Sequence, residues 1–120
     1  MLRLHQYRYH RPTVLADALA LLAEREDALP IAGGTDLMPN MKHQLWTPNH
    51  LVGLKGSAEL HGIRLADAEG RPVEEGRPEA VELVIGAGET LADLARDPLV
   101  RRHFPSLAET AAHVGGPQIR

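Results

Sequence analysis

The chain has 120 residues, of which 16 are acidic and 13 are basic, and its formal net charge is −3. This length suits one domain or two small subdomains, and the mixed charges lack a basic block that could follow a phosphate backbone, so nucleic acid is not an expected partner. The chain has no cysteine and cannot hold a disulfide or an iron–sulfur cluster by itself. No stretch approaches the roughly 20 apolar residues of a membrane span, so a cytoplasmic protein is expected.

The first expected helix has Thr13 as its N-cap and ends in the polar stretch 24–27. Four apolar residues have the i, i+3, i+4, i+7 spacing that places side chains on one buried face: Leu15, Ala18, Leu19 and Leu22. Residues 29–32 then predict a short buried strand that runs directly into the pair Gly33 and Gly34.

A second helix and a second strand follow the glycine pair. Thr35 or Asp36 is predicted to cap a helix that runs to about Leu45, with Pro39 tolerated in its first turn. Residues 50–54 predict the strand. A strand, a helix and a strand in this order favour parallel pairing, so the first half is expected to be a small α/β unit.

The second half begins with a different pattern. Residues 63–65 and 81–85 predict two strands, and two polar turn sequences between them indicate a long loop. A second glycine pair, Gly86 and Gly88, follows the later strand. We favour a structural turn there, because no third glycine follows at the dinucleotide-binding spacing.

Two short helices are expected after this turn. Thr90 with Asp93 and Ser106 with Glu109 each form the pattern of a capping box before apolar residues. Residues 113–120 contain a helix-ending glycine pair and then an expected extended segment. This segment leads to no further element, so the chain is expected to be cut there.

The turn at Gly33 and Gly34 is the stretch most suited to chemistry. Two glycines between a strand and a helix let the backbone approach a ligand, and their N–H groups and the Thr35 hydroxyl can bind an anion such as a pyrophosphate. The alternative is that the glycines only supply positive φ for a tight turn. The motif is neither G-x-G-x-x-G nor a P-loop, because the third glycine and the Gly-Lys-Ser/Thr sequence are missing.

No residue set in the sequence predicts catalysis or metal binding. The seven histidines form neither an HExxH motif nor a pair at i, i+4. No Ser–His–Asp or Cys–His arrangement can be assembled. If the chain is part of an enzyme, we expect a cofactor to do the chemistry.

Four motifs together resemble one family. They are residues 9–13 before the first helix, 31–37 at the glycine turn, 83–88 at the second glycine pair, and 104–108 in the last expected helix. The chain resembles the FAD-binding medium subunits of the xanthine dehydrogenase and carbon monoxide dehydrogenase group of molybdopterin dehydrogenases, over its whole length.

Two segments of the chain resemble one member of this group more than the others. Residues 34–42, with His10, Arg11 and Pro12 before them, look closest to the β subunit of 4-hydroxybenzoyl-CoA reductase. That resemblance implies that electrons from ferredoxin flow inward, and that a molybdenum site on another chain converts 4-hydroxybenzoyl-CoA to benzoyl-CoA with loss of water.

The family resemblance implies an α+β fold with an α/β-like N-terminal part, like the FAD-binding fold of the vanillyl-alcohol oxidase (PCMH) superfamily, in truncated form. Residues 1–55 would form a small parallel α/β FAD-binding subdomain. Residues 56–120 would begin a larger mixed α+β FAD-binding subdomain, cut before its second glycine motif. FAD would lie between the two subdomains.

The resemblance also implies which residues contact FAD. The first flavin motif would hold the pyrophosphate with its backbone, and one later contact would be Val114. The motif comprises Pro30, Ile31, Ala32, Gly33, Gly34, Thr35, Asp36 and Leu37. No residue is expected to be catalytic or to bind a metal.

The implied function is that of an oxidoreductase subunit that is not catalytically complete alone. FAD would relay electrons between an acceptor or donor and partners that carry the other cofactors: a molybdopterin large subunit and an iron–sulfur small subunit, or downstream sequence for further clusters. Two alternatives remain open at this point. One is the flavin subunit of an oxidising xanthine, carbon monoxide or aldehyde-type molybdenum hydroxylase, and the other is an assembly domain without flavin.

Overall fold

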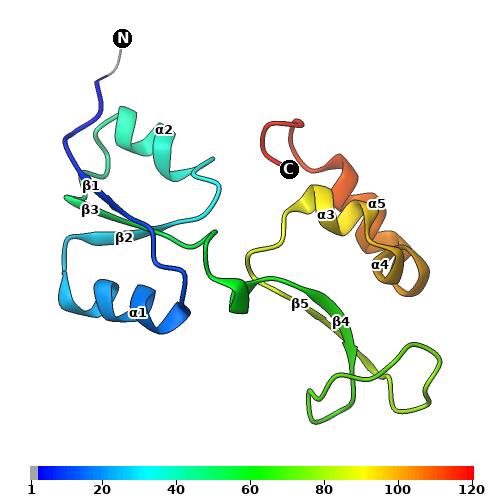
Figure 1. Ribbon diagram of the computed structural model, residues 1–120. Helices are drawn as coiled ribbons and strands as arrows, with labels where there is room; N and C mark the ends of the chain where they lie inside the picture. The colour runs from blue at the N-terminus through cyan, green and yellow to red at the C-terminus, as the bar shows by residue number, and fades with distance from the viewer. Residues whose placement is uncertain (1–2) are drawn as a thin grey trace. The chain divides into compact units, whose positions relative to one another are not determined.

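The computed structural model describes residues 3–120, and these form two compact units that meet in sequence between Leu60 and His61 (Figure 1). Each unit mixes helices with strands, as expected for an α+β protein. Among the helices of the described residues, none combines the length and the apolar character needed to cross a membrane.

The first unit is built on a three-stranded parallel sheet. Its strands are β1 (Arg8–His10), β2 (Ala28–Ile31) and β3 (His50–Gly53), in the order β1-β3-β2. The predicted parallel pairing of the second and third strands is confirmed. Strand β1 was not predicted, because its three residues are polar and show no alternation that would mark a strand.

Helix α1 (Leu15–Glu24) packs on this sheet through a smaller face than predicted. Ala18 is fully buried against Ala28 and Val52, and Leu21 and Leu22 pack around them. Leu19, which the spacing placed on the buried face, is 59% exposed. The helix has more apolar side chains than the short sheet can cover, so the i, i+3, i+4, i+7 spacing wrongly predicted that Leu19 is buried.

The predicted cap of α1 is also wrong. Val14 rather than Thr13 occupies the N-cap, and no side chain of the cap accepts a helix N–H. Instead the Glu59 carboxylate, from the short 3-10 helix η1 (Ala58–Leu60), accepts the Leu15 N–H at 3.2 Å. A partner 44 residues away satisfies the first free N–H of the helix.

The second unit starts with an antiparallel pair, β4 (Ile63–Ala66) and β5 (Glu82–Ile85), which confirms both predicted strands. The loop that joins them is organised by one carboxylate. Asp67 accepts the N–H groups of Glu69 and Arg71 at 3.0 and 2.9 Å, and also the Arg71 side chain at 2.7 Å.

Three helices complete this unit: α3 (Leu91–Arg96), α4 (Pro98–His103) and α5 (Pro105–His113). They enclose a small core of Leu94, Val100, Ala108 and Ala111, on which apolar residues of β4 and β5 pack. The sequence patterns predicted two helices here. Helix α4 was missed because, unlike α3, its six residues follow no capping-box pattern, and they are too few for an apolar period.

The helix caps show which local signals were reliable. Thr90 caps α3 as predicted, since its hydroxyl oxygen accepts the Asp93 N–H at 3.1 Å. Ser106 does not cap α5, because the helix already begins at Pro105 and Phe104 is the N-cap. The cap of α4 is Asp97, whose carboxylate accepts two N–H groups at 2.9 and 3.0 Å.

The last residues are not extended as expected. Gly115 has a φ of +59°, and Ile119 donates its N–H to the Gly116 carbonyl at 3.0 Å. The Arg120 guanidinium donates to the Gly115 carbonyl at 2.8 Å. These bonds turn the segment back on itself.

A histidine pair links the two strands β1 and β3. The Nε2 atom of His10 lies 2.9 Å from Nδ1 of His50, and the half-buried rings stack with centroids 5.2 Å apart. Burial, the neighbouring His50, and the cations Arg25 and Arg8 all lower the pKa of His10 below its ordinary value. The folded chain therefore favours a neutral ring at this position.

We predict that this pair makes the stability of the chain decline in mild acid. Because the folded pKa of His10 is the lower one, the unfolded chain binds a proton first as the pH falls below about 6.5, and the free energy of unfolding decreases. Urea unfolding at a series of pH values should show a shallower decline in His10→Gln. An identical pH dependence in the variant and the wild type would contradict the assignment.

Candidate functional site

The site of interest is the loop between β2 and α2 (Leu37–Lys42) in the first unit. The chain leaves the sheet at Ile31 and enters the helix six residues later. Gly34 has a φ of +71°, a conformation that side-chain-bearing residues rarely adopt. Its carbonyl accepts the Met38 N–H at 2.9 Å, which joins the turn to the helix.

The two glycines of the turn have different surroundings. A Cβ atom on Gly34 would lie 3.0 Å from the Met38 side chain and 3.2 Å from that of Ile31. A Cβ atom on Gly33 would meet only the Thr35 methyl group, at 3.9 Å, and the φ of Gly33 is not positive. The interpretation that both glycines supply positive φ therefore holds for Gly34 alone. The protein itself does not require a glycine at position 33.

The loop presents free hydrogen-bonding groups. Within residues 3–120, no protein acceptor receives the N–H groups of residues 33–37. The side chains of Thr35 and Asp36 are exposed and likewise bond to no other group of the described residues. Asp36, one of the two residues predicted to cap this helix, occupies the N-cap of α2, but its side chain makes no capping bond.

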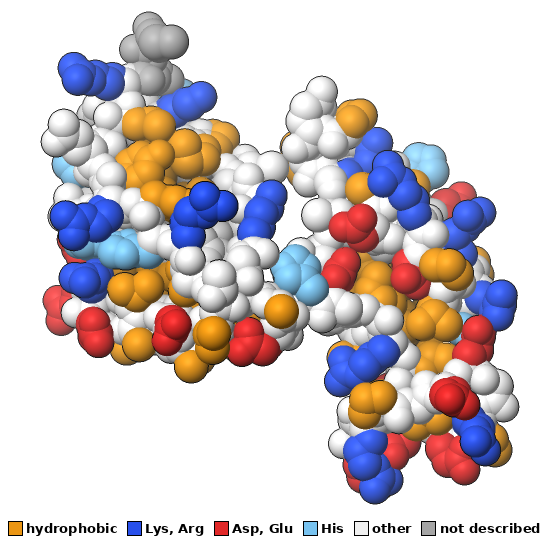
Figure 2. All heavy atoms as spheres, in the orientation of Figure 1, with side chains coloured by type: hydrophobic (Ala, Val, Ile, Leu, Met, Phe, Trp, Pro, Cys, Tyr) orange, Lys and Arg blue, Asp and Glu red, His pale blue; other side chains and the backbone are white. Residues whose placement is uncertain are grey.

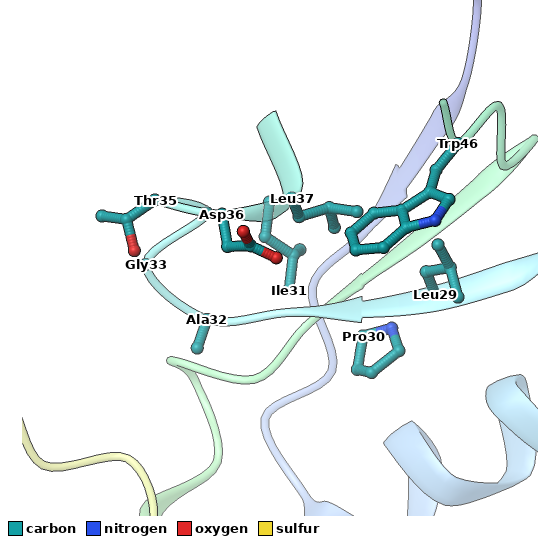
Figure 3. A pocket seen from close by; sticks show the side chains of 10 residues that line it. Leu29, Pro30, Ile31, Ala32, Gly33, Thr35, Asp36, Leu37 and Trp46 are labelled. Atoms are coloured by element: carbon teal, nitrogen blue, oxygen red, sulfur yellow. The ribbon is translucent and has the colours of Figure 1, made fainter. Parts of the chain in front are cut away.

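These groups border a cavity of about 470 Å³ (Figure 3). Every residue of the expected first flavin motif contributes to its wall, together with two neighbours. The lining comprises Leu29, Pro30, Ile31, Ala32, Gly33, Gly34, Thr35, Asp36, Leu37 and Trp46. Val114, the expected later contact, belongs to the second unit, where it follows α5 and is 43% exposed.

Trp46 is the wall residue that sequence reasoning missed. Helix α2 ends at Lys42, three residues before the predicted end, in a Schellman motif. Leu45 and Gln44 donate their N–H groups to the carbonyls of Asn40 and Met41, both at 3.0 Å. Gln44 has a φ of +57°, which brings the following residues back towards the cavity.

The only feature of the sequence that could have drawn attention to this residue is that it is a lone tryptophan. Trp46 is the one tryptophan of the chain, and it lies in a polar segment just before Pro48. Its side chain is 44% exposed. The left-handed conformation of Gln44 costs roughly 1–2 kcal/mol relative to the right-handed one. Because position 44 is not a glycine, the sequence did not indicate this conformation.

We predict that alanine destabilises the chain at Gly34 but has little effect at Gly33. Gly34→Ala should lower the free energy of unfolding by about 1–2 kcal/mol, because alanine resists positive φ and its methyl group would contact Met38 and Ile31. Gly33→Ala should change it by less than about 0.5 kcal/mol, because its methyl group enters open space. Urea unfolding of both variants tests this, and equal losses would refute it.

On the face shown in Figure 2, hydrophobic side chains gather over the α2 part of the first unit, whereas acidic and basic side chains are interspersed elsewhere. The wall of the cavity also carries large apolar side chains, those of Leu29, Ile31, Leu37 and Trp46. A loop with free N–H groups beside such a surface can bind a ligand that combines an anionic group with an apolar ring.

The chain is similar to known proteins over most of its length. The chain is 42% identical over 115 residues to the carbon monoxide dehydrogenase medium chain of Afipia carboxidovorans, covering 95% of this chain and 35% of that protein. It is 39% identical over 112 residues to the xanthine dehydrogenase FAD-binding subunit of Escherichia coli O157:H7, covering 93% and 34%. The chain therefore spans about a third of the length of these relatives.

A solved structure shows the same fold. The carbon monoxide dehydrogenase of Hydrogenophaga pseudoflava superposes with a TM-score of 0.83 at 36% identity, over 98% of this chain and 37% of the matched one. The model of the FAD binding domain in molybdopterin dehydrogenase matches residues 5–120. The chain belongs to this family of FAD-binding domains.

Proposed function

We propose that the loop of residues 30–37 holds the pyrophosphate of FAD. The N–H groups of residues 33–37 have no protein acceptor within residues 3–120, and each bond to a charged oxygen would contribute about 1.5–3 kcal/mol. Gly33 leaves open space where a phosphate could approach the backbone. This open position is the observation that carries the proposal.

The carboxylate of Asp36 must be accommodated in this arrangement. It lies in the cavity wall, where it would repel a phosphate placed directly against it. A carboxylate is a good acceptor for hydroxyl groups. We therefore place the Asp36 side chain beside a sugar or ribityl hydroxyl of the dinucleotide, and leave the phosphates to the backbone N–H groups.

The proposal for the whole protein is a flavin subunit of an oxidising molybdenum hydroxylase. It rests on the names of the relatives, a xanthine dehydrogenase FAD-binding subunit and a carbon monoxide dehydrogenase medium chain. Bound FAD would supply two-electron transfer at its ring. The chain has no cysteine, so molybdopterin and the iron–sulfur clusters would be held by a large and a small partner subunit or by further sequence.

The narrower alternative is 4-hydroxybenzoyl-CoA reductase, in which electrons from ferredoxin flow inward. It rests on the resemblance of residues 34–42 alone, whereas the relatives above favour outward flow from an oxidised substrate. A flavin-free assembly domain would not need the free N–H groups around Gly33. Val114 remains the proposed later contact with the flavin.

The substitution Gly33→Val tests the flavin site at a position where an added Cβ would meet only the Thr35 methyl group. We expect at least a tenfold loss of bound FAD per purified protein, because the side chain would occupy the space proposed for the pyrophosphate. Released FAD is measured by chromatography and fluorescence, with circular dichroism and urea unfolding as controls for the fold. A stable Gly33→Val protein with full FAD content would contradict the proposed site.

A further inference from the structure

The cavity beside the glycine loop has two chemically different ends. Thr35 and the loop N–H groups form one end, and Trp46 stands at the other beside Leu29 and Leu37 (Figure 3). A pyrophosphate needs only the polar end. The apolar end is open to a different part of the same ligand.

The backbone turn after α2 sets the position of Trp46. The Schellman motif after α2 brings the chain back at Leu45, through the N–H bonds to Asn40 and Met41. Gln44 takes a left-handed conformation to make this turn. Residues held in rare conformations cluster at ligand sites, because the surrounding structure must stabilise them.

The indole ring still has an available surface. Trp46 is 44% exposed, and within residues 3–120 it makes no aromatic contact and its N–H bonds to no other group. Stacking another flat ring on an aromatic side chain that is partly exposed to solvent lowers the free energy of the complex. Leu45, its neighbour, is 68% exposed but does not line the cavity.

We propose that Trp46 stacks on a planar heteroaromatic ring of the dinucleotide, and that it sets the affinity of this site for FAD. The inference rests on the proposed function, since the loop would anchor the pyrophosphate. Both the adenine and the flavin ring of FAD are planar heteroaromatic rings that could stack on the indole. A cavity of about 470 Å³ lies within the size range of small-ligand pockets, so it can enclose one such ring with its phosphates.

Three variants of the full-length protein, stripped of flavin, test the proposal. Trp46→Ala removes the ring and should weaken FAD binding about tenfold or more, the usual range for loss of one base–aromatic stack. Trp46→Phe keeps a ring and should lose clearly less. Leu45→Ala is the matched control, because it removes an exposed apolar neighbour outside the cavity wall, and its Kd for FAD should equal that of the wild type.

A spectroscopic readout identifies the ring. The difference in fluorescence between wild type and Trp46→Phe isolates the emission of Trp46, and FAD should quench it. Quenching by ADP assigns the adenine, and quenching by FMN assigns the flavin ring; either outcome supports the proposal.

The outcomes separate this inference from the flavin assignment. If wild type binds FAD while Trp46→Ala binds it equally well, or if FAD leaves the Trp46 emission unchanged, the stacking role is refuted and the loop assignment stands. If wild type binds neither FAD nor ADP, the proposed function itself fails. Urea unfolding of Trp46→Ala excludes a loss of fold as the cause of weak binding.

Discussion

The first unit depends on how the chain leaves β2. The strand that ends at Ile31 turns within a few residues into α2, and glycine suits position 34 because its φ is positive and an added Cβ would lie 3.0 Å from the Met38 side chain. The same turn leaves a row of N–H groups without protein acceptors among the described residues. One backbone constraint therefore produces both the fold of this unit and its free hydrogen-bond donors.

A second constraint acts at the other end of α2. The helix stops after six residues because Gln44 adopts a left-handed conformation, and the bonds of Leu45 and Gln44 to the last helical carbonyls stabilise the reversal. The two turns, one before and one after the helix, bring the loop and Trp46 to the wall of one cavity. A short helix is thus enough to join a polar and an apolar surface.

Much of this arrangement could be predicted from local patterns. The strand at 28–31, the glycine turn after it and the cap at Thr90 depend on near neighbours, and the sequence shows them directly. The cap of Leu15 by Glu59 and the exposure of Leu19 depend on distant residues, which periodicity does not contain. Trp46 was missed because a glutamine, not a glycine, takes the left-handed position before it.

The absorption spectrum of the intact protein, purified with its native partners, tests the central claim most directly. We expect flavin bands in the visible region that bleach on addition of dithionite, and release of FAD rather than FMN when the protein is denatured. Absorption from the proposed iron–sulfur partner subunit is separated by quantifying the released flavin. A complex that folds and assembles but releases no FAD would contradict the assignment of the glycine loop as a flavin site.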